Sequence, residues 1–442
     1  MPAVKKYRKI RPLQLIAVIF FTVSGGPYGL EPLLGYVHDH GALLLLLVTP
    51  LLWDIPAIFT VLELNSMMPV TGGYYQWVKH ALGPRWGFYE GWWTWLYTFA
   101  DLAIYPVLFI QYAGFFFPGI AAYKIPVCLG IVWTSAALNI WGIVPVGRVA
   151  LALSLVVLLP FILLFAVFAQ HHTGGFLLPS PSLKGITYLS LGLGIYTVMW
   201  NCFGWDNVTT YAEEVEKPER AYFVSVFAAF ILVMVVYTGV IIVAQLSGIN
   251  YKTFADQGLP ALGVLINGRW LGSIIAFAGL ASTLGLYAAN LLSVSRLPKV
   301  MADDGFLPMR LHKLHPRFNT PYVSIIVCSI VISLMCLWTF GDLLIIDVTV
   351  YGAGLFLEYI SLIKMRVVEP DRVRPFKISL NTRWLIILLI LPITVYGVAL
   401  TGVLSSMSEA LKPALFALAA LLSGDLVWRI IRWRKPHLRN NF

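Results

Sequence analysis

Residues 20–37 read FFTVSGGPYGLEPLLGYV, an apolar stretch that glycine, proline and glutamate interrupt near its middle. Pro12 to Ser24 would form about 18 Å of helix, so the interruption lies near the middle of a bilayer. Pro27 lacks an amide hydrogen, and the glycines tolerate non-helical backbone. Unpaired backbone groups are costly in lipid. The stretch therefore predicts a membrane helix that unwinds beside protein or a water-filled cavity.

The composition of the 442-residue chain predicts an all-α integral membrane protein. Hydrophobic residues make up 59% of it and charged residues 12%, against roughly 25% charged residues in soluble proteins. We expect a single transmembrane domain over residues 1–442, because the apolar runs leave no room for a soluble domain. The twelve predicted spans lie near 13–38, 42–67, 86–117, 124–143, 148–170, 187–213, 220–247, 269–297, 321–340, 342–363, 383–403 and 409–430.

The net charge of +10 does not predict nucleic-acid binding, because the basic residues lie between the spans and form no single patch. They favour one side of the membrane instead. Five of the 31 fall in the segments taken as outer: Lys124, Lys184, Lys252, Arg269 and Lys412. The other 26 are cytoplasmic if both termini are inside. We expect a protein of the cytoplasmic (plasma) membrane with both termini in the cytoplasm, and no basic residue within the membrane.

Several acidic residues, in contrast, fall within the predicted spans. They are Glu31, Asp54, Glu63, Asp101, Asp206, Asp347 and Glu358. Each costs about 2.5 kcal/mol or more at mid-bilayer, so each is a functional candidate. A structural alternative stays open for three: Glu63 and Glu358 near water at helix ends, and Asp54 bonded to a neighbouring helix.

A second interruption, Cys202 to Asp206, falls at mid-depth in span six. The two broken spans are five apart and cross in opposite directions. This arrangement predicts a 5+5 inverted repeat with a central site. The expected first repeat covers 13–170, the second covers 187–363, and two additional helices cover 383–430.

The broken helices predict the chemistry of that site. Their ends offer carbonyls to an ammonium group and amides to an anion. Glu31 would satisfy the amides itself and repel a substrate carboxylate, and Asp101 adds a second acid, so the pocket favours a cation. Asp206 could instead cap the second half of span six. Tyr105 and Trp205 could lie over a cation, or simply pack between helices.

Four segments resemble those of the amino acid–polyamine–organocation superfamily, and the likeness covers nearly the whole chain. They are SGGPYGLEP in helix one, ELNSMMPVTGGYYQWVKHALGPRWGFYEGW at helices two to three, GWDNVTTYAEEVEKPER in helix six and SRLPKVMADDGFLPMRLHKLHPRFNTPYVSI before helix nine. The SGGPYG form followed by Glu31, with DLAIYPVLF in helix three, looks closest to plant-type polyamine uptake permeases.

The resemblance implies a twelve-helix transporter that works by alternating access. It implies that residues of helices one and six line the substrate site, and that Glu31 and Asp101 bind substrate amines. With Tyr105, the expected substrate-binding residues are Ser24, Gly25, Gly26, Gly29, Glu31, Asp101, Tyr105, Asn201, Gly204, Trp205 and Asp206.

Energy coupling stays open at this point. Some relatives carry a helix-five lysine in place of sodium, and the corresponding VALALSLVVLLPFILLFAVF has none. Transport could be driven by a proton that binds Glu31 or Asp101, or by sodium that binds near Ser282 and Thr283. It could also be an exchange of substrates that needs no ion.

We expect a proton-coupled importer of a polyamine or amino acid in the bilayer, with an ion gradient as driving force and neither cofactor, metal nor nucleic acid. The alternative is a neutral amino acid permease or exchanger, and less favoured readings are a nutrient sensor or a membrane-embedded enzyme. HExxH, GxSxG and paired metal-ligand motifs are absent from the sequence.

Overall fold

The computed structural model describes residues 12–70, 72–142, 148–172, 180–207, 209 and 218–434, and the regular structure in these ranges is entirely helical. The first half contains α1 (Pro12–Val23), α2 (Pro32–Leu52), α3 (Asp54–Met67), α4 (Gly73–Leu82), α5 (Pro84–Gly114), the short η1 (Ile120–Tyr123), α6 (Lys124–Ile140) and α7 (Arg148–His171). The second half contains α8 (Tyr188–Cys202), α9 (Pro218–Ser247), α10 (Tyr251–Gln257), α11 (Leu259–Asp303), the short η3 (Met309–His312), α12 (Tyr322–Met335), α13 (Phe340–Val368), α14 (Thr382–Leu404) and α15 (Met407–Arg434).

These helices confirm the predicted all-α membrane fold. Nine stretches of the described residues are long and apolar enough to cross a bilayer, and α1 and α12 are shorter apolar helices. The first predicted span is divided between α1 and the start of α2, which bends again at His38. The second span continues through α2 into α3. Span six ends as a regular helix at Cys202, and most of its predicted second half lies outside the described residues.

Local sequence signals set several helix ends. Thr187, Asn250 and Asn381 each accept a backbone N–H with the side chain at the start of α8, α10 and α14. Thr339 and Asp342 form a reciprocal capping box at the start of α13. Such caps satisfy amides that the first helical turn leaves unpaired.

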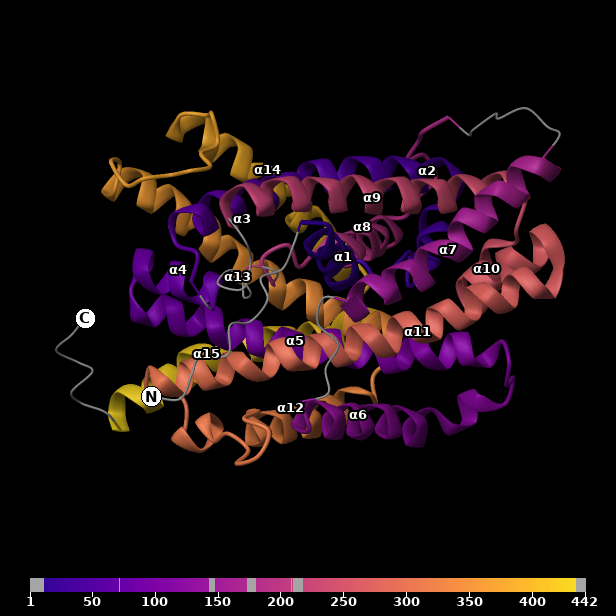
Figure 1. Cartoon of the computed structure of the whole chain (residues 1–442). Coiled ribbons are helices and arrows are strands. Elements are labelled where there is room, and N and C mark those ends of the chain that lie inside the picture. The colour runs from indigo at the N-terminus through magenta and orange to yellow at the C-terminus, as the bar shows by residue number, and fades with distance from the viewer. Residues whose placement is uncertain are drawn as a thin grey trace.

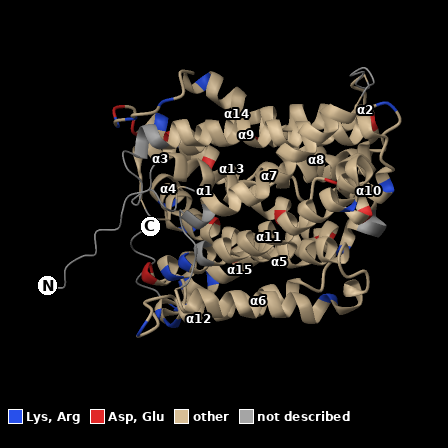
Figure 2. Cartoon of the chain, turned by 45° about the vertical axis from the view of Figure 1, so that its right-hand side comes forward, with Lys and Arg blue, Asp and Glu red and all other residues tan. Residues whose placement is uncertain are grey.

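The long helices α2, α5, α6, α9 and α11 run roughly side by side, whereas α1 and α8 are inclined to them (Figure 1). α5 packs against α13 and α11, and most of its side chains are buried. α6 and α12 pack together at one face of the bundle. α4 and the loop between α13 and α14 lie at one end of the bundle, and α10 lies at the other. Lysine and arginine lie toward the two ends, whereas several acids lie between the helices (Figure 2).

Candidate functional site

The first helix break depends on three glycines with left-handed backbone. Gly25, Gly26 and Gly29 have φ values of 58°, 99° and 92°. At Gly29, an added Cβ would lie 2.6 Å from Cζ3 of Trp200, a distance that side chains do not tolerate. Glycine is therefore required where the backbone leaves α1, both for its conformation and for the close approach of α8.

Hydroxyl groups already bind the carbonyls at this break. The Tyr237 hydroxyl from α9 lies 3.1 Å from the Gly26 carbonyl and 3.0 Å from the Asn201 carbonyl, and so joins the two breaks. The same hydroxyl lies 2.8 Å from Oγ of Ser24. Ser282 donates to the Gly25 carbonyl. These carbonyls, expected to receive a substrate ammonium, are bonded to protein in this conformation.

Both carboxylate oxygens of Glu31 accept hydrogen bonds next to the break. Its Oε2 accepts the Gly29 N–H at 2.7 Å, and its Oε1 accepts the Tyr112 hydroxyl at 2.8 Å and the Leu259 N–H at 3.1 Å. The side chain is buried. Glu31 thus occupies a free amide of the break, as expected, and also ties it to α5 and to the start of α11.

A small cavity lies on the other side of the break. It is lined by Thr22, Val23, Ser24, Asp101, Tyr105, Trp200, Asn201, Phe203, Gly204, Asn207 and Asn290. Its volume is about 20 Å³, which is room for one water molecule. A polyamine or amino acid fits only after the surrounding helices move, so this conformation is closed.

Asp101 is the acid of this cavity. Its carboxylate accepts the Tyr105 hydroxyl at 3.1 Å, and Oδ1 lies 3.4 Å from the indole nitrogen of Trp200. Asn290 of α11 donates to the Tyr105 hydroxyl at 3.2 Å. The carboxylate of Asp347 from α13 repels that of Asp101, and neither of its oxygens has a hydrogen-bond partner in the part of the chain that the structure describes. The described lining of the cavity therefore offers an acid and no basic side chain.

The second break turns its acids and indole away from the cavity. Gly204 has a φ of 94° after α8 ends. The Trp205 indole donates to Oδ1 of Asp54 at 3.2 Å, so Asp54 bonds the break after α8, where its structural alternative expected a bond to a helix. Asp206 accepts the Tyr351 hydroxyl at 3.0 Å. The helix that Asp206 was expected to cap falls mostly outside the described residues.

The structure brings together one part of the predicted site. Ser24, Asp101, Tyr105, Asn201 and Gly204 line the cavity. The remaining expected residues lie outside its lining, and their contact with substrate stays a prediction: Gly25, Gly26, Gly29, Glu31, Trp205 and Asp206. Of the sodium candidates, Ser282 bonds the break, and Thr283 bonds its own helix at the Gly279 carbonyl.

Sequence reasoning missed four residues of this region. They are Glu90, Tyr237, Asn290 and Tyr351. Glu90 lies within the span predicted at 86–117, so its charge was a usable signal. The other three are polar side chains in apolar helices, and nothing in their local sequence indicates which distant backbone or carboxylate they contact.

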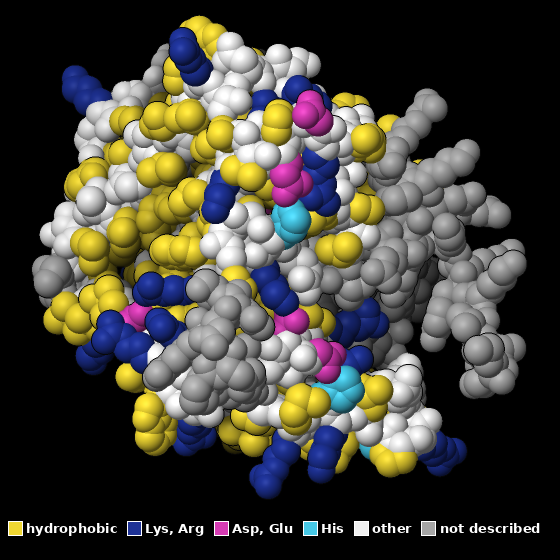
Figure 3. Space-filling view, turned by 90° about the vertical axis from the view of Figure 1, so that its left-hand side faces the viewer, with side chains coloured by type: hydrophobic (Ala, Val, Ile, Leu, Met, Phe, Trp, Pro, Cys, Tyr) yellow, Lys and Arg dark blue, Asp and Glu magenta, His cyan; other side chains and the backbone are white. Residues whose placement is uncertain are grey.

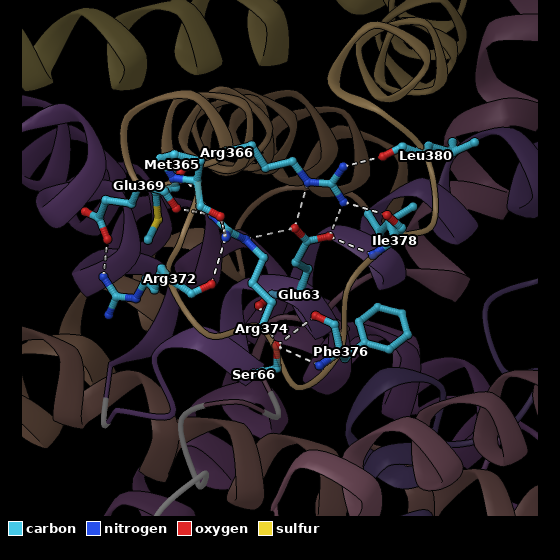
Figure 4. Close-up of polar contacts among 11 residues, drawn as sticks. Glu63, Ser66, Met365, Arg366, Glu369, Arg372, Arg374, Phe376, Ile378 and Leu380 are labelled. Atoms are coloured by element: carbon cyan, nitrogen blue, oxygen red, sulfur yellow. Dashed lines mark hydrogen bonds and ion pairs between the residues drawn. The ribbon is translucent and has the colours of Figure 1, made fainter.

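Glu63 forms a buried ion cluster with two arginines that the sequence predicts in a cytoplasmic loop. Nε of Arg366 on α13 donates to Glu63 at 2.7 Å, and Nε of Arg374 lies 3.6 Å away (Figure 4). The Ile378 N–H also donates to Glu63, at 2.9 Å. Arg366 was assigned to a cytoplasmic loop because it follows the predicted span 342–363. Its side chain is 4% exposed.

The cluster folds the α13–α14 loop back onto α3. Ser66 donates to the Phe376 carbonyl at 3.0 Å, next to the ion cluster (Figure 4). At the rim, Arg372 donates to Glu369, and His80 contacts the same carboxylate. These two partners, Arg372 first, hold the pKa of Glu369 below its usual value.

Membrane-length helices, with breaks beside a small cavity that contains Asp101, define an integral membrane protein with an internal polar site. The sequence profile described as "Amino acid permease" matches residues 10–421. The chain belongs to this family, within the amino acid–polyamine–organocation superfamily, and the predicted resemblance is confirmed.

Known transporters match along most of the chain. It is 31% identical to the polyamine transporter RMV1 of Arabidopsis thaliana, over 95% of this chain and 85% of the relative. It is 30% identical to the polyamine transporter PUT1 of Oryza sativa subsp. japonica, over 98% and 80%. Identity to the probable agmatine/putrescine antiporter AguD of Lactococcus lactis is 22%, over 83% of each.

Proposed function

We propose that the chain imports a polyamine across the cytoplasmic membrane by alternating access, driven by a proton gradient. The observation that carries the proposal is the Asp101 carboxylate in a cavity whose lining, as far as the structure describes it, contains no lysine, arginine or histidine. Asp347 is a second buried acid, and neither of its oxygens has a hydrogen-bond partner among the described residues. An ammonium group would pair with the ionised form of Asp101, and the names of the plant relatives agree with such a substrate.

Aromatic rings complete a site for an amine. Trp200 and Tyr105 lie beside Asp101, with ring centroids 6.4 Å apart. The face of an indole or phenol attracts a cation by about 0.5–2 kcal/mol. Trp200 also packs edge-on against Phe340 at the start of α13. Separation of Trp200 from Phe340 would open the cavity to one side of the membrane.

An amino acid is the alternative substrate, and the family description favours it. A zwitterion needs a site for its carboxylate as well as for its ammonium group. The Gly29 amide at the outer half-helix would be suitable, but Glu31 already occupies it. The geometry therefore supports a cation without a carboxylate.

The proposed orientation places both termini in the cytoplasm. Figure 3 views the end of the bundle that carries the α13–α14 loop, and lysine and arginine outnumber acidic side chains on it. Positive charge on that end agrees with a cytoplasmic position. An inside-negative potential then favours entry of a cation by about 2.3 kcal/mol per charge per 100 mV.

Uptake into proteoliposomes tests the proposed function. Labelled putrescine, spermidine, arginine and leucine are offered with and without an inward proton gradient. We expect uptake of the two polyamines, stimulated by the gradient. Uptake of leucine alone, with no competition by putrescine, would establish the amino acid permease instead.

A further inference from the structure

A second group of buried acids lies between α5, α13 and the break after α8. Glu90 on α5, Glu358 on α13 and Asp206 are each at most 2% exposed. Their position follows from helix geometry. Glu90 precedes Asp101 by 11 residues, and Glu358 follows Asp347 by 11 residues. Eleven residues make about three helical turns and about 16 Å, so each helix carries two acids on one face.

The close packing of α5 on α13 brings Glu90 and Glu358 to the same level. Gly354 lies four residues before Glu358, on the same face of α13. A Cβ at Gly354 would lie only 3.1 Å from Oε1 of Glu90. Tyr351, seven residues before Glu358 and so on the same face of α13, donates to Asp206. The three carboxyl groups therefore lie along one helix interface.

Two of these carboxyl groups have an oxygen without a partner. Oε1 of Glu90 is 3.3 Å from the hydroxyl of Thr94, and Oδ1 of Asp206 accepts the Tyr351 hydroxyl at 3.0 Å. Oε2 of Glu90 and Oε2 of Glu358 have no hydrogen-bond partner within the described ranges. A buried polar atom without a partner is costly, so these two oxygens indicate that the group binds something small.

Among the described residues, the surroundings of the group supply no counter-ion. The titratable groups facing it are Tyr97 from α5, Tyr74 from α4, Tyr351 and Tyr359 from α13, Asp347 from α13 and Asp54 from α3. This set, drawn from the described residues, contains no lysine, arginine or histidine. The described residues also contain no group of His, Cys, Asp and Glu arranged to hold a metal ion. Three buried negative charges without a cation are unstable, and a proton is the cation that this space accepts.

We propose that Glu90, Asp206 and Glu358 form the proton-binding site of the transporter, separate from the amine site at Asp101. A proton entering from outside forms one O–H bond on Glu90 or Glu358. That bond breaks when the proton leaves to the cytoplasm, so one positive charge crosses with each proton. This inference rests on the proposed function for its coupling to amine import.

Tyr351 links the proton site to the amine site. Its hydroxyl accepts the Gly204 N–H at 3.3 Å and donates to Asp206 at 3.0 Å. Gly204 lines the cavity next to Asp101. Movement of the break around a bound amine therefore shifts the hydroxyl that bonds Asp206, and with it the charge balance among the three acids.

Infrared spectroscopy of the purified protein in lipid tests proton binding without any substrate. We expect a carboxylic-acid C=O band at neutral pH in the wild type that is lost in Glu90→Gln or Glu358→Gln. The matched control, Asp256→Asn, removes an exposed acid on α10 and should leave the band unchanged. If neither glutamine variant changes the band, the three acids are ionised and the inference is wrong.

Proton flux then tests the coupling. Proteoliposomes containing a pH-sensitive dye receive external putrescine, and internal acidification is measured beside labelled uptake. Both glutamine variants should keep putrescine–putrescine exchange and lose acidification, whereas Asp256→Asn keeps both. Unchanged acidification per amine in both variants would overturn the inference while amine transport stands. A wild type that has the infrared band but takes up no amine would refute the proposed function and leave the proton site.

Discussion

Asp101 combines a position in the cavity with contacts from two aromatic residues. Tyr105 lies one turn further along α5 and donates to it, and Trp200 approaches from α8. Asp101→Asn removes the negative charge of this side chain and keeps its shape. The variant therefore tests the attraction of the carboxylate for an amine apart from its packing. Breaking a buried charge pair by removing one partner costs about 3–5 kcal/mol.

We therefore predict that Asp101→Asn weakens putrescine binding by more than about a hundredfold, because 1.4 kcal/mol corresponds to tenfold. Binding of labelled putrescine to purified protein measures this. Asp256→Asn should bind as the wild type does. Equal affinity in Asp101→Asn and the wild type would place the ammonium group elsewhere.

A second residue-scale prediction concerns the hydroxyl that joins the two helix breaks. Tyr237→Phe leaves the Gly26 and Asn201 carbonyls without this donor, which costs about 1–3 kcal/mol of unfolding free energy. Tyr359→Phe is the matched control, because the buried Tyr359 hydroxyl has no partner among the described residues. Thermal unfolding in detergent should show destabilisation in Tyr237→Phe alone. Equal unfolding temperatures for the two variants would show that the Tyr237 hydroxyl does not stabilise the fold.

At the scale of helices, the Glu63 cluster holds α3, α13 and the α13–α14 loop together. Glu63→Gln would leave Arg366 and Arg374 buried without their carboxylate, which predicts a loss of about 3–5 kcal/mol. Glu369→Gln breaks a rim contact whose carboxylate side chain is 32% exposed, and exposed pairs contribute about 0–1 kcal/mol. The two variants are compared by thermal unfolding.

The double variant Glu63→Gln/Arg366→Gln tests whether Glu63 and Arg366 stabilise each other. It removes charge from both sides, so it should recover part of the stability that Glu63→Gln loses. The loss of unfolding free energy in the double variant is compared with the sum of the losses in the two single variants. A larger loss in the double variant would mean that Glu63 and Arg366 do not stabilise each other.

Helices were more predictable than their contacts. Apolar runs placed most spans within a few residues, although α2 crosses the expected gap between the first two spans and α11 begins ten residues before the eighth. Gly25 and Gly26 marked the first break because the backbone there needs glycine. Glu31 was correctly expected to bond the free amide. The pairing of Glu63 with Arg366 was not predictable, because it joins residues 303 positions apart. Nor could the pattern show that Trp205 faces Asp54 and not the cavity, since both sides of a buried helix are apolar.

At the scale of the whole molecule, the membrane orientation is open to a direct test. The four native cysteines are buried, so an introduced exposed cysteine reacts over a low background. Asp256→Cys lies on α10 at one end, and Asp371→Cys lies in the α13–α14 loop at the other. We predict that a membrane-impermeant maleimide labels Asp256→Cys on intact cells, and labels Asp371→Cys only after permeabilisation. The reverse pattern would invert the proposed orientation.

The distance between Glu63 and Arg366 along the chain has a consequence for synthesis of the protein. Ribosomes add about 5–20 residues per second, so the 303 residues between them take roughly 15–60 s to make. During this delay the second span has been translated while the arginines that balance its carboxylate do not yet exist. Until they do, the Glu63 carboxylate lacks the partners that bind it in the folded protein, so the Glu63 cluster forms only after α13 and the α13–α14 loop have been made.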